Sequence, residues 1–237
     1  MLRVGLTGSL GSGKSTAAQM FAAHGAHVLS SDEVARNLMQ PGLPVYAAIV
    51  ERFGPSVVAP GGQLDRAALT RIAFQDGRIE ELNAIIHPPT IARQAQLIAE
   101  IAAHSPEAVV LVESALIFET KYSETKPGNE IGHNDENAPA EAGGWHKRFD
   151  RLILIRASED RKLARFVARA SGSAPLTPET RSALEAEGRR RLARQIDDDR
   201  KAALSDYVLI NNDSLDDLRT QIDALWPILQ AAAKSHA

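Results

Sequence analysis

The stretch RVGLTGSLGSGKSTAAQMFAAHG, residues 3–25, decides the fold class. Within it, Gly8, Gly13, Lys14 and Ser15 follow the spacing G-x-x-x-x-G-K-S, the pattern of a loop that wraps a nucleotide's phosphates. An apolar run precedes this loop, and a run with apolar residues at helical spacing follows it. Because the motif has the strand–loop–helix context that it requires, the sequence predicts a phosphate-binding loop rather than a flexible glycine-serine turn.

The residue types of this loop suit an anionic ligand. Glycine lets the backbone N–H groups approach phosphate oxygens closely, and the first N–H groups of the following helix face the same anion. Lys14 adds a mobile positive charge, and the hydroxyl of Ser15 is suited to Mg²⁺. The residues predicted to bind the nucleotide are Gly8, Gly11, Ser12, Gly13, Lys14, Ser15 and Thr16. The motif predicts nucleotide binding but does not name the reaction.

Length and composition exclude several classes of protein. The chain has 237 residues, of which 44% are hydrophobic, enough for the core of one α/β domain with a mobile subdomain. It has no cysteine, which excludes disulfides and cysteine-ligated zinc. No secretory signal is evident, and no apolar run approaches the roughly 20 residues of a membrane span. We therefore expect a cytoplasmic protein that does not bind a membrane.

Positive charge is concentrated in one part of the chain. The formal net charge is −3, but residues 161–201 carry eleven Lys and Arg against six Asp and Glu. Such a basic segment could bind polyphosphate or nucleic acid, or it could be a solvated helix face. Aromatic residues make up only 5% of the chain, so we expect no nucleic-acid partner.

Five apolar runs predict the strands of a parallel sheet, at residues 3–7, 26–30, 108–112, 151–155 and 206–210. Helical patterns separate them, which predicts right-handed crossovers, and S-L-D-D at 214–217 is expected to cap the last helix. Residues 32–104 are mostly helical, and 176–204 form a charged helical stretch. Residues 120–147 have four glycines and two prolines and are predicted to be a mobile surface loop. In that loop, His133 and His146 are spaced too irregularly to indicate a metal site.

Three classes of nucleotide-binding protein fit these features: a small-molecule kinase, a regulatory GTPase and a motor or nucleic-acid ATPase. The sequence after the last predicted strand is NNDS, which lacks the lysine of the guanine-reading Asn-Lys-x-Asp motif. The arginine-rich helical segment is typical of a lid that excludes water during transfer of a phosphoryl group. The sequence therefore favours a kinase.

The chain resembles the dephospho-coenzyme A kinase family. After the phosphate-binding loop come, in the family's order, SSDEVARNLMQPG at 30–42, LDRAAL at 64–69, IIHPPT at 85–90, ALIFE at 115–119 and RQIDDDRKAALSDYVLINN at 194–212. The resemblance covers nearly the whole chain. It implies ATP-dependent phosphorylation of the ribose 3′-hydroxyl of dephospho-CoA, the last step of CoA synthesis, with no obligate protein partner.

The resemblance also implies a fold. It is a P-loop NTPase-type three-layer α/β domain over residues 1–237, with a five-stranded parallel sheet. A helical subdomain at 32–104 would bind the acceptor, and a helical lid would occupy 161–201. Two other functions remain open from the residues alone. They are a nucleoside or nucleotide monophosphate kinase of similar architecture, and a non-catalytic ATP-dependent switch.

The family's functional positions fall on named residues of this chain. Asp32 matches the proposed general base, although it could equally cap the following helix. Arg194 matches a lid arginine that would act with Lys14 on the transferring phosphoryl group, with a surface ion pair as the alternative. Arg66 and His87 match positions on the acceptor side, where a histidine before proline is often structural.

Four features depart from the family's pattern, and the first of them bears on its metal site. Glu113 stands where relatives usually have Asp, and with Ser15 it would hold Mg²⁺, unless it is only a satisfied carboxylate at a strand end. Ser30 stands where relatives often have Asp, which leaves Asp32 as the one acid of that pair, and Ala115 stands where they usually have Pro. Most of residues 120–147 is extra to the family.

Overall fold

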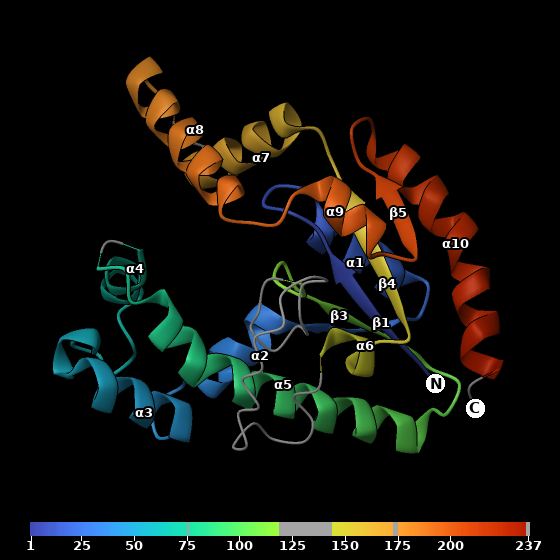
Figure 1. Cartoon of the computed structure of the whole chain (residues 1–237), viewed down its shortest axis with the longest axis horizontal. Helices are drawn as coiled ribbons and strands as arrows, with labels where there is room; N and C mark the ends of the chain where they lie inside the picture. The colour runs from blue at the N-terminus through green and yellow to red at the C-terminus, as the bar shows by residue number, and fades with distance from the viewer. Residues whose placement is uncertain (75, 119–143, 173–174, 236–237) are drawn as a thin grey trace, which may run out of the picture. The chain divides into compact units, whose positions relative to one another are not determined.

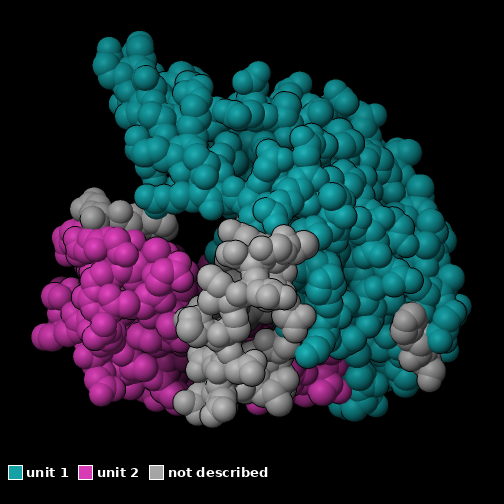
Figure 2. All heavy atoms as spheres, in the orientation of Figure 1, with its two compact units in different colours: residues 1–28, 101–130, 143–237 teal, residues 29–100, 131–142 magenta. Residues whose placement is uncertain are grey.

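The computed structural model describes residues 1–74, 76–118, 144–172 and 175–235. Figure 1 shows their helices and strands. The chain divides into two compact units, which are coloured separately in Figure 2. The first contains residues 1–28 and the described residues after 100, and the second contains residues 29–100. The second unit overlaps the stretch 32–104, for which the sequence predicts a helical subdomain.

A five-stranded sheet organises the fold. Its strands are β1 (Leu2–Thr7), β2 (His27–Ser30), β3 (Val109–Glu113), β4 (Arg151–Arg156) and β5 (Tyr207–Ile210). Their order is β2-β3-β1-β4-β5, and β1 pairs in parallel with both β3 and β4. Each strand lies within two residues of a predicted one, so the sequence prediction of a parallel α/β sheet is confirmed.

One face of the sheet is covered by the helices α1 (Lys14–Ala23) and α10 (Leu215–Ser235), as Figure 1 shows. Phe21 from α1 and Leu218 from α10 are fully buried there. The ring centroids of Phe21 and Trp226 lie 6.5 Å apart. The strands are apolar runs because β1, β3 and β4 bury nearly every side chain.

The predicted cap of α10 is confirmed. The Ser214 hydroxyl accepts a hydrogen bond from the Asp217 backbone N–H at 3.1 Å, and the Asp217 carboxylate accepts one from the Ser214 N–H at 3.0 Å. This reciprocal pairing satisfies N–H groups that an uncapped helix end would leave without partners.

The face of the sheet opposite α1 and α10 is covered in part by α6 (Trp145–Arg148) and the residues beside it. The rings of Phe118 and Trp145 meet edge to face at 5.4 Å. A side chain at Gly5 would collide with Leu152 and Ile117, so these two side chains lie directly against the β1 backbone. Most of the predicted loop at 120–147 lies outside the described residues, but its last residues differ from that prediction because they begin α6.

The basic segment contains three helices, α7 (Glu159–Ser171), α8 (Pro178–Ala193) and α9 (Asp198–Ala203). The helices α7 and α8 pack against each other as a hairpin. They come close at Gly188, where a Cβ atom would lie 2.8 Å from a methyl carbon of Leu163 and 3.1 Å from the Phe166 ring. The sequence predicts a long helical stretch over 176–204, and the structure divides it into two helices with a break at residues 194–197. Asp197 caps a new helix by accepting a hydrogen bond from the Asp199 N–H at 2.8 Å.

The second unit is helical, as predicted. Its elements are α2 (Ser31–Leu38), α3 (Pro44–Phe53), the 3₁₀ helix η1 (Pro55–Val57), α4 (Arg66–Phe74) and α5 (Ile79–His104), which extends past residue 100. Ile49, Val57 and Leu82 belong to its own hydrophobic cluster. Among the helices of the described residues, none combines the length and apolar character needed to cross a membrane.

Glu81 links two helices of the second unit. Its carboxylate accepts hydrogen bonds from the Arg78 guanidinium at 2.8 Å and pairs with Arg52 at the end of α3. The hydrogen bonds from Arg78, followed by those from Arg52, lower the pKa of Glu81 to about 2. A lowered folded-state pKa stabilises the fold above the unfolded value of about 4.3, and this contribution is lost as the pH falls through the folded value.

We therefore expect Glu81→Gln to lower the melting temperature at pH 7, with a deficit that shrinks as the pH approaches 2. Thermal unfolding of both proteins between pH 7 and pH 2.5 measures this difference. Glu80→Gln, in the same helical turn, is the control for loss of a negative charge. A deficit of the same size at both ends of the range would contradict the assigned ion pairs.

Candidate active site

The loop between β1 and α1 needs glycine at several positions, among them Gly11 and Gly13. Gly11 and Gly13 have φ angles of +74° and +99°, in the left-handed region that favours glycine. A Cβ atom at Gly11 would collide with the carbonyl oxygen of Lys162, and one at Gly13 would collide with the side-chain amide of Asn211. The predicted phosphate-binding loop therefore folds close against α7 and the end of β5.

Lys14 lies across this loop. Its ammonium group donates hydrogen bonds to the carbonyl oxygens of Gly8 at 2.7 Å and Ser9 at 3.2 Å. Gly13 is the N-cap of α1 and supplies no side chain, and the first turn of α1 has no acidic residue. The first N–H groups of α1 therefore lack a side-chain cap, and the helix dipole and the Lys14 charge both favour an anion here.

Ser15 and Glu113, the two residues that the sequence analysis assigns to Mg²⁺, lie next to each other. The Ser15 hydroxyl donates a hydrogen bond to a Glu113 carboxylate oxygen at 2.7 Å. Glu113 ends β3 and lies in register with Leu6 of β1, next to the start of the loop. Among the described residues, no three His, Cys, Asp or Glu side chains form a metal cluster. A hydroxyl and a carboxylate nevertheless fit Mg²⁺, which takes few protein ligands when phosphates and water complete its octahedral shell.

Two side chains that support the loop were not predicted. Asn211, buried after β5, donates a hydrogen bond to the Ser12 carbonyl at 2.8 Å. Arg165 of α7 donates to the same carbonyl at 3.3 Å and to the Asn211 side-chain oxygen at 3.1 Å. Burial, followed by the charge of Arg161, lowers the pKa of Arg165. The sequence contained one signal, the Asn-Asn pair after the last strand, but not the long-range contact.

Asp32 does not cap α2. Ser30 is the N-cap, and its hydroxyl accepts the Glu33 backbone N–H at 3.4 Å. Asp32 lies in the first turn of the helix and is exposed. The capping role that the sequence left open for Asp32 therefore belongs to Ser30. Ser31, the residue before Asp32, is also held in place. The buried side chain of Gln94 in α5 donates a hydrogen bond to the Ser31 hydroxyl at 2.8 Å.

The two predicted acceptor-side residues lie in the second unit on different helices. Arg66 is exposed at the start of α4, where Asp65 caps the helix by accepting the Ala67 and Ala68 N–H groups at 2.8 and 3.1 Å. His87 is half-buried inside α5, which continues through Pro88 and Pro89 although prolines usually interrupt a helix. The roles of Arg66 and His87 in binding stay predictions.

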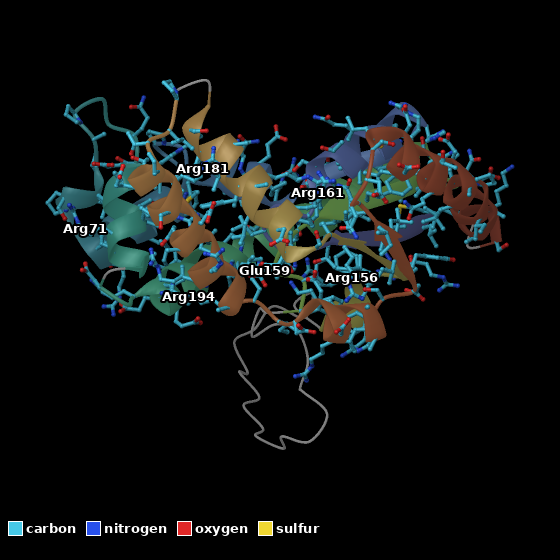
Figure 3. The ribbon with its side chains drawn as sticks, turned by 90° about the horizontal axis from the view of Figure 1, so that it is seen from above. Arg71, Arg156, Glu159, Arg161, Arg181 and Arg194 are labelled. Atoms are coloured by element: carbon cyan, nitrogen blue, oxygen red, sulfur yellow. The ribbon has the colours of Figure 1, made fainter. Side chains whose placement is uncertain are left out.

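Arg194 is the C-cap residue that follows α8, and it is exposed (Figure 3). Two arginines of the preceding turns of α8 have acidic partners. Arg190 and Arg191 both bind the Glu187 carboxylate, at 2.7 and 2.8 Å. Arg156 at the end of β4 pairs with Asp199 at 2.5 Å. Within the basic segment, Arg190 and Arg191 are thus salt-bridged side chains on a helix surface. The role of Arg194 itself stays a prediction.

Sequence comparisons bear on the identity of the chain. The family model described as dephospho-CoA kinase matches residues 2–128. A dephospho-CoA kinase of Symbiobacterium thermophilum is 36% identical over 224 residues, which cover 94% of this chain and 79% of that protein. A dephospho-CoA kinase of Streptomyces avermitilis is 32% identical over an alignment that covers 95% of this chain and 93% of that protein.

Solved structures share the fold. The crystal structure of TT1252 from Thermus thermophilus matches with a TM-score of 0.65 and 26% identity, over 96% of this chain and 97% of that one. Dephospho-CoA kinase from Campylobacter jejuni matches with a TM-score of 0.61 and 20% identity, over 99% and 98% of the two chains. At that identity, the second match bears on the fold alone.

Proposed function

The chain belongs to the dephospho-CoA kinase family, and we propose that it transfers the γ-phosphoryl group of ATP to the ribose 3′-hydroxyl of dephospho-CoA. The observation that carries the proposal is the loop at Gly8–Ser15, with Lys14 across it and an uncapped helix behind it. This arrangement suits the phosphates of a nucleotide, and family membership supplies the acceptor.

In the proposed reaction, Asp32 is the general base. A ribose hydroxyl is a poor nucleophile, and a carboxylate within hydrogen-bond reach can accept its proton as the new oxygen–phosphorus bond forms. The bond between the γ-phosphorus and the oxygen that bridges it to the β-phosphate breaks, and ADP leaves. The capping role of Ser30 supports this assignment because the helix does not need the exposed Asp32 carboxylate for its cap.

The metal proposed for this site is Mg²⁺, held by the Ser15 hydroxyl, with Glu113 orienting its water ligands. When bound, the ion neutralises charge on the phosphates. The 2.7 Å hydrogen bond between Ser15 and Glu113 supports a shared role for these two residues. In the same proposal, Arg194 binds the transferring phosphoryl group when the lid closes, and Arg66 and His87 hold the acceptor.

The proposal is tested by assaying the purified protein with Mg²⁺ and ATP against dephospho-CoA, nucleoside monophosphates and no acceptor. We expect ADP and CoA to form in equal amounts, and only in the assay in which dephospho-CoA is the acceptor. Phosphorylation of a nucleoside monophosphate would support the alternative kinase, and ATP binding without transfer would support the non-catalytic switch. An assay without Mg²⁺, in excess chelator, tests the metal. A cytoplasmic location is part of the same proposal.

A further inference from the structure

The two ends of the α7–α8 hairpin both contact the phosphate-binding loop. At the first end, Lys162 and Arg165 lie on the first turns of α7. At the second, Gln195 and Asp198 follow α8. We call these four residues the hairpin base. Their contacts with the loop all lie within the first unit.

Asp198 is the centre of the hairpin base. It is buried, with 8% of its surface exposed, and its carboxylate accepts a hydrogen bond from the Lys162 ammonium at 2.8 Å. Its other oxygen accepts a hydrogen bond from the Ser9 hydroxyl of the loop. Burial alone would raise the pKa of Asp198, but the hydrogen bonds from Lys162 and Ser9, with the charges of Lys162 and Lys201, hold it below its ordinary value. Asp198 is therefore a buried carboxylate at neutral pH.

Ser9 joins this carboxylate to the part of the loop that carries Lys14. The Ser9 carbonyl accepts hydrogen bonds from the Lys14 ammonium at 3.2 Å and from the Ser12 N–H at 3.1 Å. Beside it, the Leu10 N–H donates to the side-chain oxygen of Gln195 at 2.9 Å. Ser9 and Leu10 of the loop are thus both held by side chains that follow α8 in the chain.

We propose that Asp198 is a positioning residue, which through Ser9 couples the α7–α8 hairpin to the conformation of the phosphate-binding loop. A buried ion pair such as Lys162–Asp198 is seldom more stabilising than apolar residues of similar volume, so stability alone explains it poorly. A ligand that fixes the loop would also bias the hairpin, and by thermodynamic reciprocity the hairpin would bias affinity for that ligand. This inference rests on the proposed function only in requiring that the loop binds ATP.

Three variants test the coupling. Ser9→Ala removes the link to the loop and keeps the ion pair, Asp198→Asn removes the charge, and the double variant combines them. We expect each single change to weaken binding of the non-hydrolysable analogue AMP-PNP about tenfold. The double variant should bind AMP-PNP with the same affinity as whichever single variant binds it less tightly. Both changes break the same connection, the one between Asp198 and Ser9. KM for dephospho-CoA should change less than KM for ATP.

Limited trypsin digestion reports on the hairpin without any turnover. AMP-PNP should slow cleavage after Arg189, Arg190 and Arg191 of α8 in the wild-type protein, and slow it less in Ser9→Ala and Asp198→Asn. Asp216→Asn, which breaks an exposed pair with Arg219, should behave as the wild type. Ser9→Ala keeps the test decisive if Asp198→Asn does not fold.

The outcomes separate this inference from the proposed function. If the wild-type protein does not bind AMP-PNP, both fail. If the wild-type protein binds it and Ser9→Ala matches the wild type in affinity and protection, the coupling is wrong while the kinase assignment stands. Losses that multiply in the double variant would also overturn the coupling, since they would show that Ser9 and Asp198 act separately.

Discussion

Lys14→Ala should lower kcat with dephospho-CoA by on the order of 10²–10³-fold or more, because it removes the positive charge that the proposed reaction uses on the transferring phosphate. The sequence alone predicts that Lys14 adds a mobile positive charge to the loop. The structure adds two hydrogen bonds from its ammonium, to the carbonyl groups of Gly8 and Ser9. We therefore expect a small decrease in melting temperature beside the large loss of activity.

Initial rates and thermal unfolding, measured on the same preparation, distinguish these two effects. Lys234→Ala, at an exposed site of α10, is the control for loss of one lysine, and it should keep full activity. Near-normal turnover by Lys14→Ala would show that the loop does not act on a phosphate in the reaction. A protein that fails to fold would instead show that the bonds to Gly8 and Ser9 are essential for the fold.

The sheet could be predicted from the sequence mainly because its three central strands, β1, β3 and β4, are buried on both faces and read as short apolar runs. The run at 151–155, for example, becomes β4, in which Leu152, Ile153, Leu154 and Ile155 are all buried. The phosphate-binding loop was equally predictable, since Gly11 and Gly13 have backbone angles that favour glycine. Local sequence determines both features.

Helix boundaries were less predictable because single side chains decide them. The run of Asp197, Asp198 and Asp199 looks like one charged helical stretch, but the first of the three caps a new helix and the second is buried in an ion pair. In α5, Pro88 and Pro89 suggest an interruption, yet the helix continues, and the Thr90 hydroxyl donates to the Ile86 carbonyl at 2.7 Å.

The side chains that support the loop could not be predicted from spacing. Arg165 and Asn211 are separated by 46 positions, and both lie more than 150 positions from the loop they contact. Only the parallel sheet, which places the ends of β1, β4 and β5 at one edge, brings them together. The spacing of the motif predicts contacts within the loop, whereas the fold determines which distant side chains contact the loop.

Asp32→Asn should lower kcat for dephospho-CoA by about 10²–10⁴-fold, the usual contribution of a general base, with little change in affinity for ATP. The structure sharpens this prediction because Ser30, not Asp32, caps α2. The substitution then costs the fold only a favourable charge in the first helical turn, typically about 0.3–1 kcal/mol at an exposed site.

Glu33→Gln is the matched control for Asp32→Asn, since Glu33 is exposed in the same turn and its loss has the same effect on the helix dipole. We expect both variants to have similar melting temperatures, and only Asp32→Asn to lose activity. Ser30→Ala, which removes the cap, should lower stability by about 1 kcal/mol. Equal activity losses in Asp32→Asn and Glu33→Gln would show that the helix dipole, rather than proton acceptance, explains the effect. A loss of ATP affinity at unchanged kcat would place Asp32 on the nucleotide instead of the acceptor.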